Sequence, residues 1–213
     1  MKFRDRADAG RILAERLAQE ASNKPTVVLG IPRGGVILAD IVARRLGTDF
    51  DIVIPRKLGA PTNEELAIGA VMEDGTSYIN RYLTDALRVP QDYIEKEKAR
   101  QIEEIVRRTE MYRKRNMAYG IAGKQAILVD DGIATGATVI ASARWVKKHS
   151  PASLTVAVPV APIQSVEVLQ HESDHVLSIE TPRDFASVGQ FYEEFSPVSD
   201  DEIKAIMRAR NLL

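Results

Sequence analysis

Residues 126–138 change character twice over a short distance. An apolar run ends abruptly in two carboxylates, Asp130 and Asp131. Small and hydroxyl-bearing residues follow as far as Thr138, and apolar residues then recur at helical spacing. The segment therefore predicts a buried strand, an acidic turn, a loop of glycine and threonine, and a helix.

The loop between this strand and this helix suits a phosphate. It offers free backbone N–H groups at a helix N-terminus, together with the hydroxyls of Thr135 and Thr138. Asp130 and Asp131 repel a phosphate but accept hydrogen bonds from hydroxyl groups or bind Mg²⁺. An ordinary strand-to-helix turn is the alternative, although adjacent carboxylates after a buried strand have little structural use. The chemistry therefore indicates a sugar phosphate as the ligand.

The stretch Val129-Asp-Asp-Gly-Ile-Ala-Thr-Gly-Ala-Thr138 resembles the signature of type I phosphoribosyltransferases. Those enzymes transfer ribose 5-phosphate from phosphoribosyl pyrophosphate (PRPP) to a nucleophile, usually a base nitrogen. The resemblance implies that the two carboxylates hold the ribose hydroxyls and Mg²⁺, while the loop anchors the 5′-phosphate. The PRPP-binding residues implied here are Asp130, Asp131, Gly132, Ala134, Thr135, Gly136, Ala137 and Thr138.

A second motif, Gly30-Ile-Pro-Arg-Gly-Gly35, follows the first predicted strand. It lacks the glycine spacing of dinucleotide-binding loops and the lysine of P-loops. Gly34 and Gly35 let the backbone approach a ligand closely, and Arg33 offers a fork-shaped donor for phosphate oxygens. The resemblance implies that this loop binds pyrophosphate and that the peptide between Pro32 and Arg33 is cis.

A third motif, Pro55-Arg-Lys-Leu-Gly59, follows the second predicted strand. Arg56 and Lys57 form a basic pair at the carboxyl end of a strand, where α/β sheets bind ligands. A solvated strand end is the alternative. The resemblance implies that both side chains contact pyrophosphate and share the catalysis with the two carboxylates. It also implies that the loop-like residues 58–66 form a mobile lid.

Short apolar runs alternate with segments of helical period, which predicts a parallel, doubly wound α/β sheet. The resemblance covers most of residues 25–160 and implies the type I phosphoribosyltransferase fold. We expect one domain, 1–213, with a core sheet at 25–160, a helical insertion at 88–116 and a C-terminal hood at 176–213. Strands are expected at 26–30, 51–54, 67–72, 125–129 and 153–160, and helices at 7–21, 36–46, 91–115, 136–148 and 162–171.

Two segments leave alternatives open. The predicted helix at 91–115 interleaves acids and bases, as a solvated helix does. The alternative there is a surface for an anionic partner, using Arg107, Arg108, Arg113, Lys114 and Arg115. The hood segment 183–195 carries Phe185, Phe191, Tyr192 and Phe195, which either pack on the core or partly form an apolar slot for a flat ring.

The composition restricts the partners. Lys and Arg number 29 against 30 Asp and Glu, so no electrostatic argument favours nucleic acid. The chain has no cysteine, which excludes disulfides and thiol chemistry. No apolar run is long enough to span a membrane. We expect a cytoplasmic protein without membrane partners, and a homodimer is left open.

The resemblance implies an Mg²⁺-dependent pentosyltransferase of nucleotide metabolism, which moves 5-phosphoribosyl from PRPP to a small nitrogenous acceptor and releases pyrophosphate. Family members that act on hypoxanthine or guanine usually have an aspartate where this chain has Ala134, so we expect little activity with these 6-oxopurines. Glu64 and Glu65 are then candidates for the general acid or base. A non-catalytic sensor of PRPP or nucleotides is the alternative, since fold does not fix function.

Overall fold

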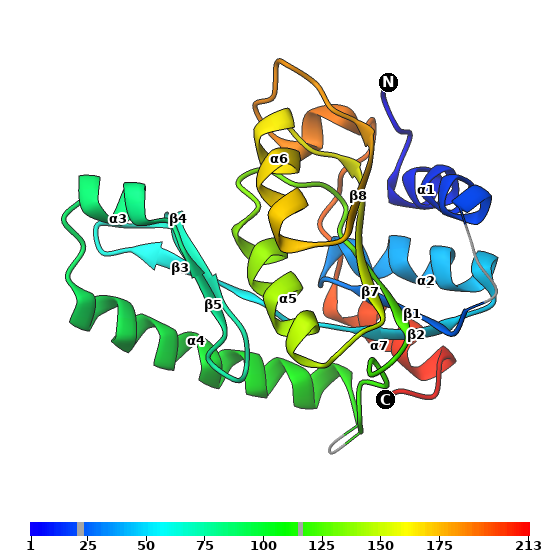
Figure 1. Cartoon of the computed structure of the whole chain (residues 1–213), viewed down its shortest axis with the longest axis horizontal. Coiled ribbons are helices and arrows are strands. Elements are labelled where there is room, and N and C mark those ends of the chain that lie inside the picture. Colours follow the sequence, from blue (N-terminus) through cyan, green and yellow to red (C-terminus); the bar gives the residue numbers. More distant parts are fainter. Residues whose placement is uncertain (21–23, 115–116) are drawn as a thin grey trace.

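The computed structural model describes residues 1–20, 24–114 and 117–213. Its centre is a sheet of five parallel strands in the order β2-β1-β6-β7-β8 (Figure 1). The sheet confirms the predicted parallel α/β architecture. Its strands are β1 (Thr26–Gly30), β2 (Asp49–Ile52), β6 (Gln125–Val129), β7 (Ser153–Val160) and β8 (His175–Glu180).

The sheet is covered on both faces, which explains why its central strands are almost wholly apolar. Side chains alternate along β1: Val28 packs in the core on one side, whereas Val27 and Leu29 pack on the other. Helices cover both faces of the sheet in Figure 1, which confirms the doubly wound arrangement. One face packs against α1 (Arg6–Glu20) and α2 (Gly34–Leu46), and the other against α5 (Ala137–Lys148) and α6 (Ile163–Glu172).

The strand order reverses between β1 and β6. After β1 the chain crosses to β2 through α2 on one face, and after β6 it crosses to β7 through α5 on the other face. The two loops therefore diverge at the carboxyl edge of the sheet and leave a crevice between them. Open α/β sheets bind their ligands at this kind of crevice.

An arm, residues 56–112, projects from the core between β2 and β6 (Figure 1). Its strands form a separate antiparallel sheet, so the expectation that 67–72 adds a strand to the core sheet is wrong. The insertion is also larger than the predicted helical segment 88–116. It consists of β3 (Arg56–Ala60), β4 (Asn63–Val71), β5 (Ser77–Ile79), α3 (Arg81–Ala86) and α4 (Gln91–Tyr112).

The expectation that residues 58–66 are loop-like is wrong as well. These residues run through the end of β3, a two-residue turn at 61–62 and the start of β4. The hairpin is tied to α4, because the Tyr93 hydroxyl donates a hydrogen bond of 3.0 Å to the Gly59 carbonyl. These residues are therefore a paired hairpin that contacts a long helix, and their movement as a lid stays a prediction.

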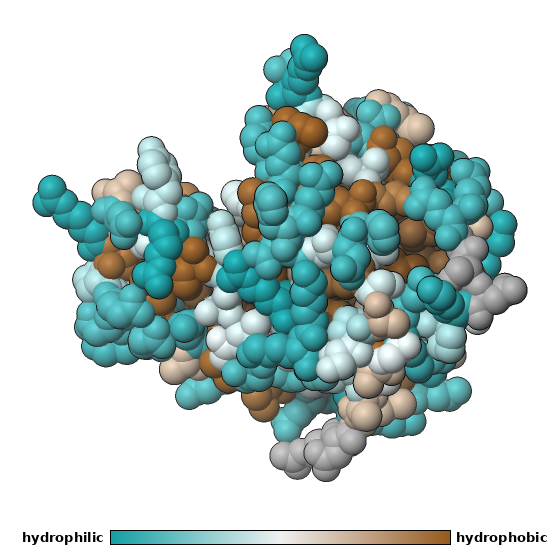
Figure 2. All heavy atoms as spheres, in the orientation of Figure 1, coloured by the Kyte–Doolittle hydropathy of each residue, from teal (hydrophilic) through white to brown (hydrophobic). Residues whose placement is uncertain are grey.

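A buried ion pair directly after α4 attaches the arm to the core sheet. Arg113 Nη2 lies 2.8 Å from Oδ2 of Asp51 on β2, and each side chain is only 4% exposed. The basic residues of this segment thus bind groups of the chain itself: Arg107 and Arg108 bind Glu104, and Lys114 donates to the Asn211 carbonyl. Arg115 lies outside the described residues. Hydrophilic side chains dominate the outer side of α4 in Figure 2, as expected for a solvated helix.

The hood begins later than predicted, because 175–180 form β8 at the edge of the core sheet. We keep the name hood for residues 181–213, which contain the short helix η1 (Val188–Phe191) and α7 (Asp200–Ala209). The N-terminal residues pair with this hood: the Phe3 N–H donates to the Phe191 carbonyl at 2.8 Å, and the Glu193 N–H donates to the Phe3 carbonyl at 2.8 Å. No helix among the described residues is long and apolar enough to cross a membrane.

Candidate functional site

A cavity of about 400 Å³ lies at the carboxyl ends of β1 and β6, in the crevice between their loops. It brings together residues from all three sequence motifs, the first helix and the hood. The predicted residues that line it are Arg33, Gly34, Lys57, Asp130, Asp131, Gly132, Ala134, Thr135, Gly136 and Thr138. Residues not predicted for it are Arg6, Val188, Pro197 and Val198, besides apolar residues of the loops.

The two glycines after β1 let the start of α2 press against the carboxylates. A Cβ on Gly34 would lie 1.8 Å from Oδ2 of Asp131, and one on Gly35 would lie 2.8 Å from the Cα of Asp130. Both distances are too short for any side chain. The peptide between Pro32 and Arg33 is cis, as expected. Gly35 itself is buried beneath the cavity.

Asp130 follows β6 directly and sits at the floor of the crevice. Its Oδ1 accepts a hydrogen bond of 2.9 Å from the Asp131 N–H. Burial raises the pKa of Asp130 well above its ordinary value, and the adjacent charge of Asp131 raises it further, while Lys57 opposes the shift. A desolvated carboxyl of this kind gains when a cation or hydroxyl donors approach.

Asp131 has partners from both ends of the chain. Its Oδ2 lies 2.7 Å from Nε of Arg6, in an ion pair whose side chains are 12% and 16% exposed. Its backbone carbonyl accepts a 2.6 Å hydrogen bond from the Tyr192 hydroxyl of the hood. Burial raises the pKa of Asp131, and the hydrogen bond and charge of Arg6 lower it.

The loop after the carboxylates presents a helix N-terminus to the cavity. Gly136 caps α5 with a left-handed backbone (φ 77°), and no side chain caps the helix. Its first N–H groups therefore have no partner within the helix and face a ligand position. Ser165 fixes the loop from α6 by donating a 2.8 Å hydrogen bond to the Ala134 carbonyl. Ala137 begins the helix and is buried behind the loop.

Strand alternation separates the basic pair of β3. Lys57 lines the cavity and lowers the pKa of Asp130 by its charge. Arg56 points to α4, where its Nε donates a 2.8 Å hydrogen bond to Oε1 of Gln101. Burial lowers the pKa of Arg56. This arrangement therefore does not favour the predicted contact between Arg56 and pyrophosphate.

Arg33 lies at the cavity mouth and pairs with the hood. Its Nη1 lies 3.7 Å from Oδ1 of Asp200 at the start of α7, and both side chains are nearly half exposed. Asp200 also accepts a short hydrogen bond from the Tyr112 hydroxyl at the end of α4. An exposed pair at this distance contributes little stability.

Several predicted residues are absent from this cavity. Glu64 and Glu65 lie on the hairpin of the arm, and Glu64 pairs with Arg100 at 3.7 Å, so the structure does not bring them to the carboxylates. Of the four hood aromatics only Phe195 lines the cavity; Phe185 stacks on Phe191 with centroids 5.6 Å apart.

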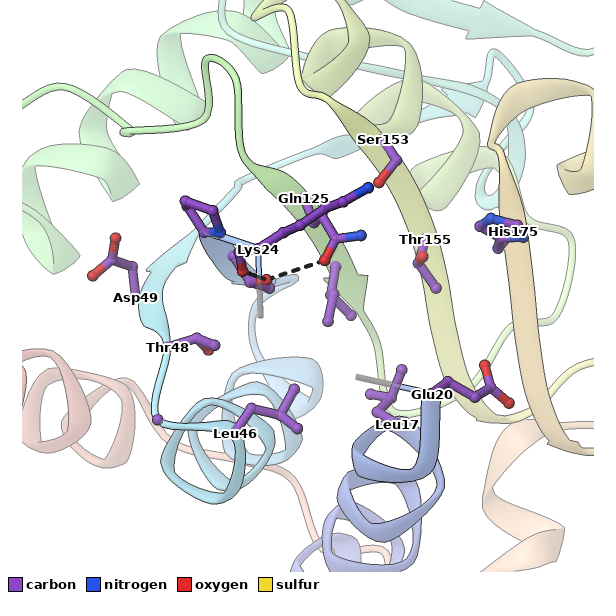
Figure 3. A pocket seen from close by; sticks show the side chains of 14 residues that line it. Leu17, Glu20, Lys24, Leu46, Thr48, Asp49, Gln125, Ser153, Thr155 and His175 are labelled. Atoms are coloured by element: carbon purple, nitrogen blue, oxygen red, sulfur yellow. Dashed lines mark hydrogen bonds between the residues drawn. The ribbon is translucent and has the colours of Figure 1, made fainter. Parts of the chain in front are cut away.

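A larger cavity of about 780 Å³ lies at the opposite edge of the sheet (Figure 3). Its lining includes Thr26, Gln125, Ser153 and His175, which are the first residues of four parallel strands. No motif residue lines it, and parallel sheets bind ligands at their carboxyl ends. The smaller cavity is therefore the candidate site.

Sequence reasoning missed Arg6 and Tyr192, the two residues that hold Asp131. Arg6 is 125 positions from Asp131 and Tyr192 is 61 positions from it. No local periodicity connects segments so far apart. The hood aromatics were visible as a cluster, but nothing in the sequence assigned the Tyr192 hydroxyl to the backbone of Asp131.

The paired carboxylates raise the question of whether the site could hold a magnesium ion. Mg²⁺ prefers oxygen ligands and is usually held by one or two carboxylates together with water and substrate phosphates. Asp130 and Asp131 lie side by side on the cavity and supply that number. In the described part of the chain no group of three or more His, Cys, Asp or Glu side chains could hold a metal ion. The residues therefore fit an ion shared with a substrate.

Two known proteins match almost the whole of this chain. A provisionally named phosphoribosyl transferase of Mycobacterium tuberculosis is 40% identical over 205 residues, or 96% of this chain. The chain covers only 46% of that relative, so it spans less than half its length. A crystal structure of a protein from Thermus thermophilus is 46% identical, with a TM-score of 0.80 over 97% of this chain and 98% of that one.

The family model named phosphoribosyl transferase domain matches residues 4–195. This range contains the loops after β1 and β6, and it reaches from the N-terminal segment to Phe195 of the hood. The chain therefore belongs to the phosphoribosyl transferase family.

Proposed function

We propose that this protein transfers the 5-phosphoribosyl group of PRPP to a small nitrogenous acceptor and releases pyrophosphate. One observation carries the proposal: the loop after β1, the two carboxylates and the N-terminus of α5 line one cavity. Each part matches one part of PRPP. A phosphate, a ribose diol and a pyrophosphate need donors, acceptors and cations respectively, and the cavity offers these side by side.

The placement of PRPP follows from the charges. The N-terminus of α5, with the hydroxyls of Thr135 and Thr138, suits the 5′-phosphate. Asp130 and Asp131 suit the ribose hydroxyls, which donate to carboxylate oxygens. Arg33 and Lys57 are the basic side chains on the pyrophosphate side. Held at three places, the sugar cannot shift while the leaving group departs.

The reaction is a displacement at the anomeric carbon. The acceptor nitrogen forms a bond to this carbon, the carbon–oxygen bond to pyrophosphate breaks, and the electron pair leaves with pyrophosphate. The ring gains positive charge in the transition state, which the two carboxylates favour. Arg33 and Lys57 stabilise the negative charge that grows on the leaving group. Arg56 has no part in this scheme.

Asp130 and Asp131 are the residues that would hold Mg²⁺, together with oxygens of PRPP and water. The ion would supply additional neutralisation of pyrophosphate. The raised pKa of Asp130 fits such a role, because a buried carboxyl beside another carboxyl is short of positive charge.

Calorimetric titration with PRPP in the presence of Mg²⁺, followed by assays of pyrophosphate release with bases and amines, tests the proposal. We expect binding, and turnover with at least one acceptor. Saturable binding without turnover for every acceptor would indicate a sensor of PRPP. Absence of PRPP binding would disprove the assignment of the cavity.

A further inference from the structure

Arg6 is the only charged side chain that α1 contributes to the cavity among the described residues. Three contacts fix its guanidinium: Nε pairs with Asp131, Nη1 donates a 2.7 Å hydrogen bond to the Ser196 carbonyl, and Cζ lies 3.9 Å from the ring centroid of Phe195. Nη2 makes no hydrogen bond to any described residue. The Arg6 guanidinium is therefore held in place on the hood side of the cavity, and its Nη2 group remains available to a ligand.

The position of Phe195 changes what an acceptor meets on this wall. Phe195 is the only hood aromatic that lines the cavity, and a flat acceptor would be expected to stack on it. The guanidinium of Arg6 already lies on that ring. An acceptor that enters beside the ribose therefore meets the guanidinium, whose planar fork matches a carboxylate.

The remaining walls restrict the size of the acceptor. Val188, Pro197 and Val198 are apolar and cover the hood side. The hood also lies close to the phosphate loop, since a Cβ on Gly132 would come within 2.5 Å of Val188 Cγ1. A cavity of about 400 Å³ is near the lower end of the usual range for ligand sites, about 300–1,000 Å³. PRPP with its three phosphoryl groups fills much of this space, which leaves room for a single ring.

We propose that Arg6 contacts the acceptor and selects a single-ring nitrogenous acceptor that carries a carboxylate. This inference rests on the proposed transfer from PRPP and names the class of its acceptor. The carboxylate pairs with the free edge of Arg6, the ring packs against the apolar hood residues, and the nitrogen faces the anomeric carbon.

Matched acceptors give the sharpest test. Pyridine and pyrimidine carboxylic acids and 2-aminobenzoate are compared with their own carboxamides, and with uracil and adenine, in assays of PRPP-dependent pyrophosphate release. We expect the wild-type protein to prefer an acid over its amide by about 10- to 100-fold in kcat/KM, as a charge-assisted contact gives. Arg6→Gln should abolish this preference, and Arg6→Lys should keep part of it.

Measuring PRPP binding as well distinguishes a role of Arg6 toward the acceptor from a role toward PRPP. Arg6 also pairs with Asp131, so Arg6→Gln is expected to weaken PRPP binding for every acceptor alike. The inference is therefore read from the ratio of kcat/KM for an acid and its amide at saturating PRPP, which Arg6→Gln should lower by about 10- to 100-fold whatever the change in the Kd of PRPP. An equal loss of PRPP affinity and of turnover with every acceptor would show that Arg6 only positions Asp131 or binds pyrophosphate, and would overturn it. Equal use of acid and amide, preference for uracil or adenine, or no turnover with any acid would also overturn it while PRPP binding stands.

Arg11→Gln is the matched control. Arg11 lies on the same helix, is half exposed and pairs with Asp8 at 3.3 Å. Its loss should leave PRPP binding and the preference for acids unchanged. Failure of the wild-type protein to bind PRPP at all would refute the proposed function itself, which is a result distinct from each outcome above.

Discussion

Gly34 has no side chain, and a Cβ at this position would lie 1.8 Å from Oδ2 of Asp131. Gly34→Ala should therefore displace Asp131 from Arg6. We expect the free energy of unfolding to fall by about 1–3 kcal/mol, the usual cost of overpacking, and PRPP affinity to fall with it. Gly47→Ala is the control, because Gly47 has a left-handed backbone with open space around it. It should cost about 1–2 kcal/mol in stability without changing the Kd of PRPP.

The buried carboxyl of Asp130 should make the free protein less stable at neutral pH. Its pKa is raised in the folded state, so the folded protein holds this proton more tightly than the unfolded chain. Stability from this group is therefore present at low pH and is lost as the pH rises from the unfolded value through the folded one. Asp130→Asn should raise the melting temperature at pH 7 and leave it nearly unchanged well below the unfolded pKa.

The same Asp130→Asn variant should bind PRPP about 10- to 100-fold more weakly, since a charge-assisted contact is lost. Thermal unfolding at several pH values and calorimetry with PRPP measure the two effects. Asp184→Asn in the exposed part of the hood serves as control for both. A stability of Asp130→Asn equal to or lower than wild type at neutral pH would contradict the electrostatic argument.

Lys57 and Arg56 are neighbours with different roles. Lys57→Met should lower kcat/KM by about 10- to 100-fold, because a cation beside pyrophosphate is lost. Arg56→Met should leave the KM for PRPP unchanged but destabilise the arm by about 1–3 kcal/mol, through its hydrogen bond to Gln101. Steady-state kinetics and urea denaturation separate the two variants. If Arg56→Met lowered kcat/KM and Lys57→Met did not, Arg56 would be the residue that contacts pyrophosphate.

The ion pair between Asp51 and Arg113 should dominate the attachment of the arm. Arg113→Met removes one partner of a pair that is 4% exposed on both sides, which usually costs about 3–5 kcal/mol. The double variant Asp51→Leu with Arg113→Met should recover much of this loss. Arg107→Met, on the exposed side of the same helix, should change little. Equal denaturation midpoints for Arg113→Met and Arg107→Met would refute this view.

Local sequence patterns predicted most of the helices and the central strands. The apolar runs ending at Gly30 and Val129 became β1 and β6, because a strand buried on both faces leaves a continuous apolar signature. The edge strand β8 was missed, since all but its exposed first residue are only partly buried and polar residues interrupt its sequence. Residues 58–66 were predicted as a loop because of their glycine and proline residues, whereas β3 and β4 pair there as a hairpin that Tyr93 of α4 contacts.

The candidate site was predictable where a single loop carries several of its groups. Asp130, Asp131 and the helix start after them are adjacent in sequence, so their chemistry can be inferred together. Strand alternation also separates Lys57 from Arg56, but only once β3 is known to be a strand. The contacts of Arg6 and Tyr192 depend on how the two ends of the chain fold back over β6, which no local pattern encodes.

Under the proposed function, the pairing between residues 3–4 and 191–194 should make residues 3–4 report whether the site holds a ligand. The amide of Phe3 is bonded to the Phe191 carbonyl, and the same short ladder holds Tyr192, whose hydroxyl rests on Asp131. If PRPP engages Asp131 as proposed, opening of this ladder should become rarer. We therefore expect hydrogen exchange at the Phe3 amide to slow when PRPP is added, although Phe3 does not line the cavity.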